Sequence, residues 1–257
     1  LSSLFHAENK ALGVSEDKNA NYTTLDKSKL RALESAITDD LLFLHLVGGE
    51  ILLVPEVKEI LTKVDRERAG RITLQIQTNG TIIPDREWKN IIKKFKRTEI
   101  TIGIPAFGED INYIGYPADW KKILATIDHF KQHNINFVIG TVVSNLNIMI
   151  LDKLFNWIQK NRYQNYFYLL YHPPIFRPTN LPKNLLQIAK ERLQKVKMKF
   201  ENKDSNKFLS DLIRLCDNPN KNSDWKGFCR EIQMRDSYRK NSIIKIIPEI
   251  KEYMNAK

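Results

Sequence analysis

The sequence has no long hydrophobic run and no recognisable targeting segment. A membrane-spanning helix needs about 20 consecutive apolar residues, whereas the longest apolar runs here have the length of a strand, as in residues 41–47. The amino end, LSSLFHAENK, turns polar within a few residues and does not resemble a signal peptide. We therefore expect a cytoplasmic protein that does not associate with membranes.

Cysteine is scarce, with only Cys216 and Cys229 in 257 residues. Two cysteines cannot form a disulfide framework, which favours a reducing compartment. They are also too few for a structural zinc site or a four-cysteine iron–sulfur cluster. The sequence thus predicts two free thiols and no metal site within this chain.

Acidic residues are outnumbered, since 41 Lys and Arg stand against 30 Asp and Glu and give a net charge of +11. The excess gathers in residues 182–257, with 18 basic and 10 acidic residues, and in KNIIKKFKR at 89–97. A basic surface raises the question of a nucleic acid or an acidic partner. In the second cluster, however, the lysines fall opposite an apolar helix face that begins at Trp88. A solvated helix face is the favoured interpretation, and nucleic acid is not expected as a partner.

Strand and helix patterns alternate over the first two thirds of the chain, which is long enough to bury a sizeable core. We expect strands at residues 41–47, 72–78, 100–105, 136–143 and 166–171, and the apolar runs at 41–47 and 166–171 predict buried strands. Between and before them we expect helices at residues 25–38, 55–64, 85–96, 118–133 and 149–160. Repeated β-α-β units predict an α/β fold with a parallel sheet and right-handed crossovers.

The pattern changes after residue 172. The closely spaced prolines of HPPIFRPTNLP predict an extended linker over residues 173–182. All later segments have helical spacing, and the expected helices cover residues 183–200, 205–217, 226–240 and 243–254. We therefore predict an α/β domain over residues 1–172 and a helical segment over residues 183–257.

Small and polar residues follow the expected strands, and these are the candidate binding residues: Gly48, Gly49 and Glu50; Thr78 and Asn79; Ser144 and Asn145; and Tyr171. In α/β folds ligands bind at the carboxyl ends of the strands. The glycines would let backbone approach a ligand, and Glu50 could hold an ammonium group. An ordinary turn with a solvated glutamate explains the GGE sequence equally well, and Asn79 is equally well explained as a turn residue. For His172 a structural role is favoured over that of a base.

The motifs GGE, TNGT, AFGE and TVVSNLN occur in this order at successive strand ends. Together they resemble the radical S-adenosylmethionine (SAM) superfamily, and in particular its twitch-domain-containing members. The segments YHPP and RKNSIIKIIPEIKEYM extend the similarity over nearly the whole chain. The resemblance implies an incomplete parallel (β/α)6-type barrel, a TIM-like fold, that binds S-adenosylmethionine across its open top.

The resemblance also implies roles for the candidate residues. Gly48, Gly49 and Glu50 would hold the methionine amino group, and Tyr171 would lie near the adenine. The ribose and the methionine carboxylate would be held by Thr78, Asn79, Ser144 and Asn145. In such enzymes a 4Fe-4S cluster reduces S-adenosylmethionine and produces a 5′-deoxyadenosyl radical that modifies a substrate. A peptide or protein substrate and an electron donor are the implied partners.

Three departures from the family pattern stand out. The cysteine motif C-x3-C-x2-C is absent, and because LSSLFHAENK resembles the stretch after that motif, we expect the first strand and the cluster ligands upstream of Leu1. Ile51 stands where relatives commonly have proline, and Pro105 stands where they usually have an acidic residue. The alternatives are a non-catalytic scaffold that binds a peptide or protein partner and, less favoured, an RNA-modifying or RNA-binding protein.

Overall fold

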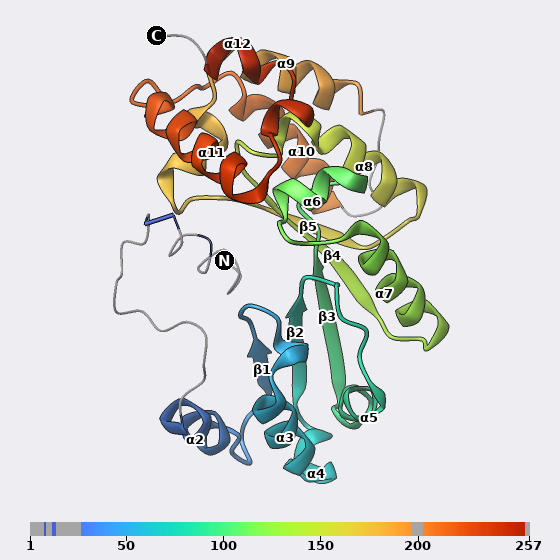
Figure 1. The fold of residues 1–257 in the computed structure, drawn as a ribbon. Helices are drawn as coiled ribbons and strands as arrows, with labels where there is room; N and C mark the ends of the chain where they lie inside the picture. Colours follow the sequence, from blue (N-terminus) through green and yellow to red (C-terminus); the bar gives the residue numbers. More distant parts are fainter. Residues whose placement is uncertain (1–7, 9–11, 14–26, 197–202, 255–257) are drawn as a thin grey trace. The chain divides into compact units, whose positions relative to one another are not determined.

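A computed structural model describes residues 8, 12–13, 27–196 and 203–254. The five strands form a parallel sheet in the order β1-β2-β3-β4-β5 (Figure 1). Their bounds are Phe43–Leu46, Thr73–Thr78, Arg97–Gly103, Phe137–Val143 and Asn165–Leu169. The predicted α/β class and strand order are confirmed, and among the described residues the sheet has two ends, as an incomplete barrel does.

The chain divides into two compact units. The first combines Leu1–Gly103 with Lys121–Val138, and the second combines Ile104–Trp120 with Ile139–Lys257. The predicted domain boundaries at residues 172 and 183 remain a prediction.

The first unit surrounds β1, β2 and β3 with short helices. These are α2 (Lys27–Ala36), the 3-10 turn η1 (Ile51–Leu53), α3 (Pro55–Lys63), α4 (Arg66–Ala69), α5 (Arg86–Lys94) and nearly all of α7 (Trp120–Gln132). Residues at the amino ends of α3, α4 and α5 explain where these helices begin. Pro55 opens α3, where a missing N–H costs nothing. Asp65 and Asp85 cap α4 and α5 by accepting hydrogen bonds from Arg68 N and Trp88 N, respectively.

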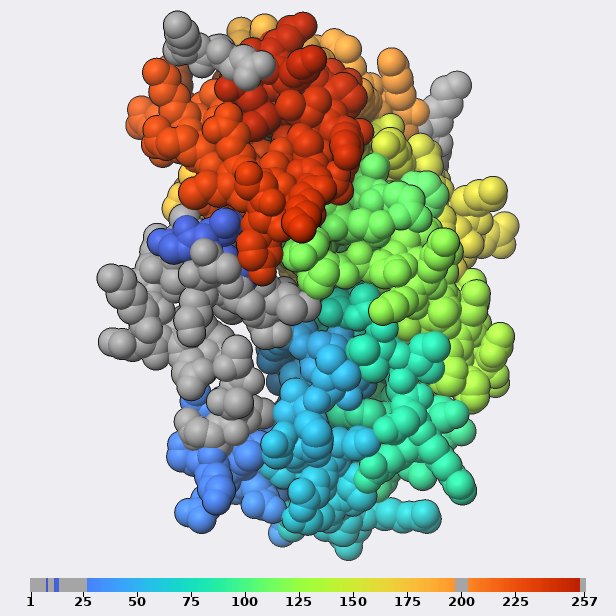
Figure 2. Space-filling model, viewed as in Figure 1, coloured from blue at the N-terminus to red at the C-terminus, as the bar shows by residue number. Residues whose placement is uncertain are grey.

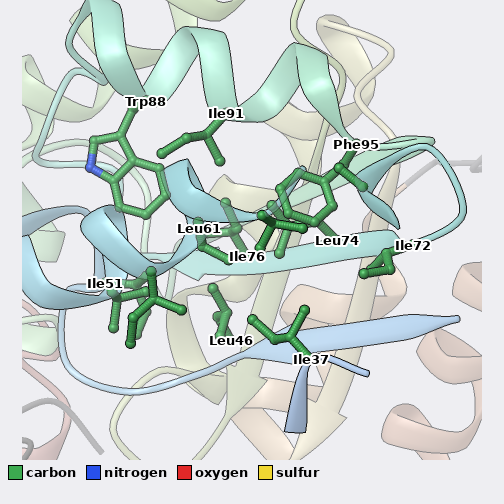
Figure 3. Packing of buried hydrophobic residues seen from close by; sticks show 14 of the residues in the cluster. Ile37, Leu46, Ile51, Leu61, Ile72, Leu74, Ile76, Trp88, Ile91 and Phe95 are labelled. Carbon is green, nitrogen blue, oxygen red and sulfur yellow. The ribbon is translucent and has the colours of Figure 1, made fainter. Parts of the chain in front are cut away.

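The core of this unit lies between the sheet and helices α3 and α5 (Figure 3). Leu74 and Ile76 point from β2 toward the helices and are fully buried. Leu61 of α3 is fully buried as well, and Trp88 of α5 is 2% exposed. Alternate residues of β2 are buried, which follows from the two-residue period of a strand.

The second unit contains most of β4, β5 and the remaining helices. Before and between the strands come η2 (Gly108–Asp110), α6 (Ile111–Ile114), η3 (Ile148–Ile150) and α8 (Leu151–Lys160). After β5 follow η4 (Pro174–Phe176), η5 (Pro178–Asn180), α9 (Lys183–Gln194), α10 (Lys203–Leu215), α11 (Trp225–Arg239), η6 (Ile243–Lys245) and α12 (Ile250–Met254). The orange and red atoms of the carboxyl-terminal helices form a continuous surface in Figure 2.

Aromatic and ionic contacts hold the second unit together. Trp120 packs edge-on against Phe107 and Trp157, with ring centroids 5.2 and 5.0 Å apart. On α11 the buried Arg235 pairs with Glu231, one turn earlier. The Trp120 contacts join separate segments of the chain, so the strand and helix periods alone could not predict them.

Five expectations about individual segments are wrong. The first strand is not buried, because Leu42, Phe43 and Val47 are 68%, 50% and 54% exposed, and β1 stands at one end of the strand order. The fifth strand region also exposes Tyr168, by 58%. The third strand ends at Gly103, two residues before proline, which offers no N–H to a ladder.

The other two corrections concern the carboxyl-terminal part. Residues 173–182 are not extended as expected, since they form η4 and η5 and bury Phe176 and Leu181, and their role as a linker stays a prediction. The single helix expected at 243–254 is interrupted at Pro248 and consists of η6 and α12. Of the helix expected at 183–200, the last residues lie outside the described ones.

The described part of the chain contains no helix that is long and apolar enough to cross a membrane. It also contains no group of three or more His, Cys, Asp or Glu side chains arranged to hold a metal ion.

A stacked histidine pair at the carboxyl end of α7 should make the stability of the first unit depend on pH. The rings of His129 and His133 lie 4.1 Å apart, and Lys89 Nζ is 3.5 Å from His133 Nε2. Burial, followed by the neighbouring His133 and Lys89, lowers the pKa of His129 below its usual 6.5. The folded protein therefore binds the proton less readily than the unfolded chain, so acidification through about pH 6.5 should lower the free energy of unfolding.

This pH dependence can be checked by denaturant unfolding between about pH 7.5 and 5.5. His129→Leu should flatten the decline at acid pH, whereas His172→Gln, at an exposed position of the second unit, should leave it unchanged. An equally steep decline in the His129 variant would assign the effect to other groups.

Candidate functional site

The Glu50 side chain lies at the carboxyl ends of β1 and β2 and accepts hydrogen bonds from three groups of the chain. Its carboxylate accepts hydrogen bonds from Thr78 Oγ1 at 2.8 Å, from Asn79 N at 2.9 Å and from Leu52 N at 3.2 Å. Because β1 and β2 are parallel, with Leu46 opposite Ile76, their ends meet at the same edge of the sheet. The structure thus brings together three of the predicted site residues.

The turn after β2 presents Thr78 and Asn79 to Glu50. Asn79 Oδ1 accepts from Thr81 N at 2.9 Å and from Thr81 Oγ1 at 2.6 Å, which is the turn role expected of asparagine. Gly80 N donates to Thr78 Oγ1 at 3.0 Å, so this hydroxyl is held by the loop and aimed at Glu50. Gly48 and Gly49 lie between β1 and Glu50, on the same connection.

The negative charge of Glu50 has no counterion in the part of the chain that the structure describes. Burial raises the pKa of this carboxyl group, while the hydrogen bonds from Asn79, Thr78 and Leu52 act in the opposite direction. A carboxylate has about four lone-pair sites, and three groups of the chain donate to this one. A half-buried, oriented and uncompensated carboxylate is suited to bind a cation with an N–H donor.

Ser144 and Asn145 lie in the second unit, in the turn after β4. Asn145 is fully buried, and its Nδ2 donates to Ile175 O at 2.9 Å. Its Oδ1 is buried without a hydrogen-bond partner among the described residues. Ser144 is 7% exposed, and its Oγ accepts from Leu146 N at 3.2 Å. The turn is thus built by its own polar side chains.

Asn147 is a residue of this turn that the sequence analysis missed. Its Nδ2 donates to Pro105 O and to Val142 O, both at 2.9 Å, and its Oδ1 accepts from Ser144 N at 2.8 Å. It therefore fixes the segment after β3 to the turn after β4. The last residue of TVVSNLN, which is also polar, was the available signal.

Tyr171 follows β5 in the second unit, and its side chain is 68% exposed. Its carbonyl oxygen accepts from Arg177 Nε at 2.8 Å, which ties the end of the strand to the turns that follow. Its ring is exposed to solvent, and its hydroxyl group forms no hydrogen bond with the residues that the structure describes.

The two cysteines lie in the helical part of the second unit, and both are free and buried. Cys216 Sγ donates to Leu212 O at 3.3 Å, and burial raises the pKa of its thiol to about 11. Burial also raises the pKa of Cys229. Because thiolates are the ligands of iron, these two thiols are poorly suited to hold a cluster.

Comparisons with known proteins agree with this architecture. The sequence model of the radical SAM superfamily matches residues 17–158, more than half of the chain. An uncharacterized protein of Methanocaldococcus jannaschii is 29% identical over 150 residues, which are 54% of this chain and 51% of that protein. The chain therefore spans about half the length of the curated relative that it matches.

A solved structure gives the same picture of the fold. Native anSMEcpe with bound AdoMet superimposes with a TM-score of 0.51 and 17% identity, over 77% of this chain and 56% of that chain. A structure of anSMEcpe with bound AdoMet and a peptide gives a TM-score of 0.47 and 15% identity, over 69% of this chain and 54% of that chain. From the family match, with the parallel sheet beside it, we conclude that the chain belongs to the radical SAM superfamily.

Proposed function

We propose that this chain binds S-adenosylmethionine, the cofactor of its superfamily, and that Glu50 holds the amino group of the methionine part. The observation that carries the proposal is the oriented Glu50 carboxylate, which no described lysine, arginine or histidine neutralises. An ammonium group would supply the positive charge and donate to the remaining lone pair. The backbone of Gly48 and Gly49 would lie beside it.

The other candidate residues divide into contacting and supporting groups in this proposal. Asn79 uses its Oδ1 in the turn, which leaves its amide N–H groups for a ligand hydroxyl or carboxylate. The hydroxyl proton of Ser144 is likewise available, because its oxygen is the acceptor in the bond to Leu146. Asn145 is fully buried, so we assign it a positioning role, and Tyr171 is proposed as the aromatic contact for the adenine.

The 4Fe-4S cluster of the superfamily does not fit the cysteines of this chain. Two buried thiols with raised pKa values cannot supply three thiolate ligands. We therefore assign the cluster's chemistry to no residue of this sequence, and ligands upstream of Leu1 remain a prediction. What the chain's own residues supply is the orientation and charge compensation of the cofactor.

We propose that the complete protein is a radical SAM enzyme that acts on a peptide or protein with the help of an electron donor. The twitch-domain subtype and the cytoplasmic location belong to the same proposal. Its support is the order of strand-end motifs over the chain. Failure to bind S-adenosylmethionine would instead favour the alternative, a non-catalytic scaffold.

The test is calorimetric titration of the chain with S-adenosylmethionine and with 5′-methylthioadenosine, which has no amino acid part. Glu50→Ala should weaken the binding of S-adenosylmethionine by about 1.5–3 kcal/mol, the contribution of a hydrogen bond to a charged group. The same variant should leave the affinity for methylthioadenosine unchanged. Glu50→Gln should also weaken it, because the amide keeps one acceptor but loses the charge.

The matched control is Glu99→Gln, which removes the same charge from β3. Glu99 already pairs with Arg97 at 3.0 Å, so it needs no ligand cation. Equal affinity of wild type and Glu50→Ala for S-adenosylmethionine would refute the proposed role of Glu50. If Glu50→Ala lost affinity equally for S-adenosylmethionine and for methylthioadenosine, the result would indicate a distorted loop and not a lost ammonium contact.

A further inference from the structure

A groove on the helical side of the first unit is separate from the residues proposed to bind S-adenosylmethionine. It lies among α3, α4 and α5 and has a volume of about 730 Å³. Its lining residues are Thr62, Arg66, Glu87, Asn90, Ile91, Lys93 and Lys94. Small-molecule sites commonly have volumes of about 300–1,000 Å³, so this groove is large enough for a small ligand.

The charges on the groove are unbalanced. Three lining side chains are basic, and Glu87 is the single acidic one. Glu87 Oε2 lies 3.1 Å from Lys58 Nζ, which also pairs with Asp85 at 2.8 Å, and the lining keeps a net positive charge. Arg66 and Lys93 form no ion pair with any part of the chain that the structure describes. Two uncompensated cations therefore border the groove from α4 and α5.

Lys94 adds a third positive charge that is fixed in place. Its Nζ donates to the carbonyl oxygens of Leu61, Thr62 and Val64 at 2.8, 3.0 and 2.6 Å, so it closes the carboxyl end of α3. Burial lowers the pKa of Lys94; the nearby Asp65 opposes this effect, and Arg66 adds to it. An anion in the groove would relieve the repulsion between Lys94 and Arg66.

The remaining lining residues narrow the class of ligand. Arg66 offers a planar fork of donors, which suits phosphate oxygens, and Lys93 offers a point charge. Asn90 is exposed and can donate through its amide group, and Ile91, 2% exposed, provides an apolar contact. A cationic rim beside an apolar contact fits a molecule with an anionic end and an organic part.

We propose that this groove binds a small organic phosphate with at least two negative charges, with Arg66 and Lys93 as its ligands. The basic cluster at residues 89–97 is then more than a solvated helix face, because Lys93 and Lys94 have defined places in the groove. The proposal goes beyond the binding of S-adenosylmethionine, whose amino group requires an anionic partner.

The test is calorimetric titration of the chain with pyrophosphate and with inorganic phosphate. Pyrophosphate should bind with one site per chain and more tightly than phosphate, because it carries more charge. Arg66→Gln combined with Lys93→Gln should lower the affinity for pyrophosphate about tenfold or more, as expected when charged hydrogen-bonding groups are lost. Lys94 is left intact because it caps α3.

The matched control is Arg86→Gln combined with Lys96→Gln, which removes the same charge from the same helical region outside the groove lining. This control should change pyrophosphate affinity by less than about twofold. Glu50→Ala should not change it at all, which separates this site from the one proposed for S-adenosylmethionine. Circular dichroism of each variant verifies the fold.

Two results would overturn the proposal. One is the absence of pyrophosphate binding to the wild-type chain at concentrations up to about 1 mM. The other is an equal loss of pyrophosphate affinity in the double variant of Arg66 and Lys93 and in the control variant of Arg86 and Lys96. If both variants also lost affinity for a single-stranded RNA oligonucleotide equally, the basic residues would form a diffuse nucleic-acid surface and not a built groove.

Discussion

Trp88→Ala is expected to lower the free energy of unfolding by about 3–5 kcal/mol, as is typical when a large buried aromatic is truncated. Trp88 is 2% exposed and lies against the sheet in the core of the first unit (Figure 3). Its Nε1 also donates to Leu52 O at 3.2 Å. Denaturant unfolding followed by circular dichroism measures the loss, and a loss below about 1 kcal/mol would contradict it.

The same substitution should weaken binding of S-adenosylmethionine, because Trp88 supports the site indirectly. Its partner Leu52 lies in η1, which Glu50 caps, and Leu52 N donates to Glu50 Oε1. The matched control is Phe130→Ala, which empties a fully buried position on α7. We expect comparable destabilisation from the control but a smaller loss of affinity at a temperature where both variants are folded.

Trp88→Phe separates packing from the hydrogen bond. It keeps most of the volume and leaves Leu52 O without its indole donor, so we expect a loss of about 1–2 kcal/mol. If Phe and Ala variants were equally unstable, the hydrogen bond and not the cavity would dominate.

The sheet and one part of the candidate site could be predicted from the sequence because their causes are local and periodic. Alternation of strands and helices permits few topologies, and the order of the five strands followed from it. Glu50 and Thr78 were expected together because both follow strands that end at the same edge. Predicting that these two residues lie close together required only the positions of the strands and not the contacts of their side chains.

Features that depend on tertiary neighbours were not predictable in this way. An apolar run such as residues 41–47 has the same pattern in the middle of a sheet and at its end, so the exposure of Phe43 was missed. Asn147 was missed because its partners, Pro105 O and Val142 O, come from different segments. The burial of Phe176 within a proline-rich stretch likewise depends on packing and not on local propensity.

Gly80 belongs to this second group. The motif TNG indicates a turn, and the structure gives Gly80 a φ of +72°, which other residues adopt at a cost. A Cβ atom at this position would also lie 2.7 Å from Ile102 Cγ2 on β3, closer than real Cβ contacts. The sequence around Gly80 contains no sign of this second constraint.

Gly80→Ala is therefore expected to lower the free energy of unfolding by about 3 kcal/mol, from about 1–2 for the left-handed backbone and about 1–3 for overpacking. Gly108→Ala is the matched control, because Gly108 has a φ of +64° but a Cβ atom there would have no neighbour within 4 Å. Its loss should be confined to the backbone cost, about 1–2 kcal/mol. Equal losses for the two variants would show that Ile102 gives way freely.

The second effect of Gly80→Ala reaches the candidate site. Gly80 N donates to Thr78 Oγ1, and Thr78 Oγ1 donates to Glu50, so a shift of the loop away from Ile102 moves the group that orients the carboxylate. We expect weaker binding of S-adenosylmethionine by Gly80→Ala and unchanged binding by Gly108→Ala, both measured by calorimetry on folded protein. Unchanged affinity in Gly80→Ala, despite lost stability, would mean that Thr78 holds Glu50 without help from this loop. The proposed role of Glu50 would then not depend on the hydrogen bond from Gly80 N to Thr78 Oγ1.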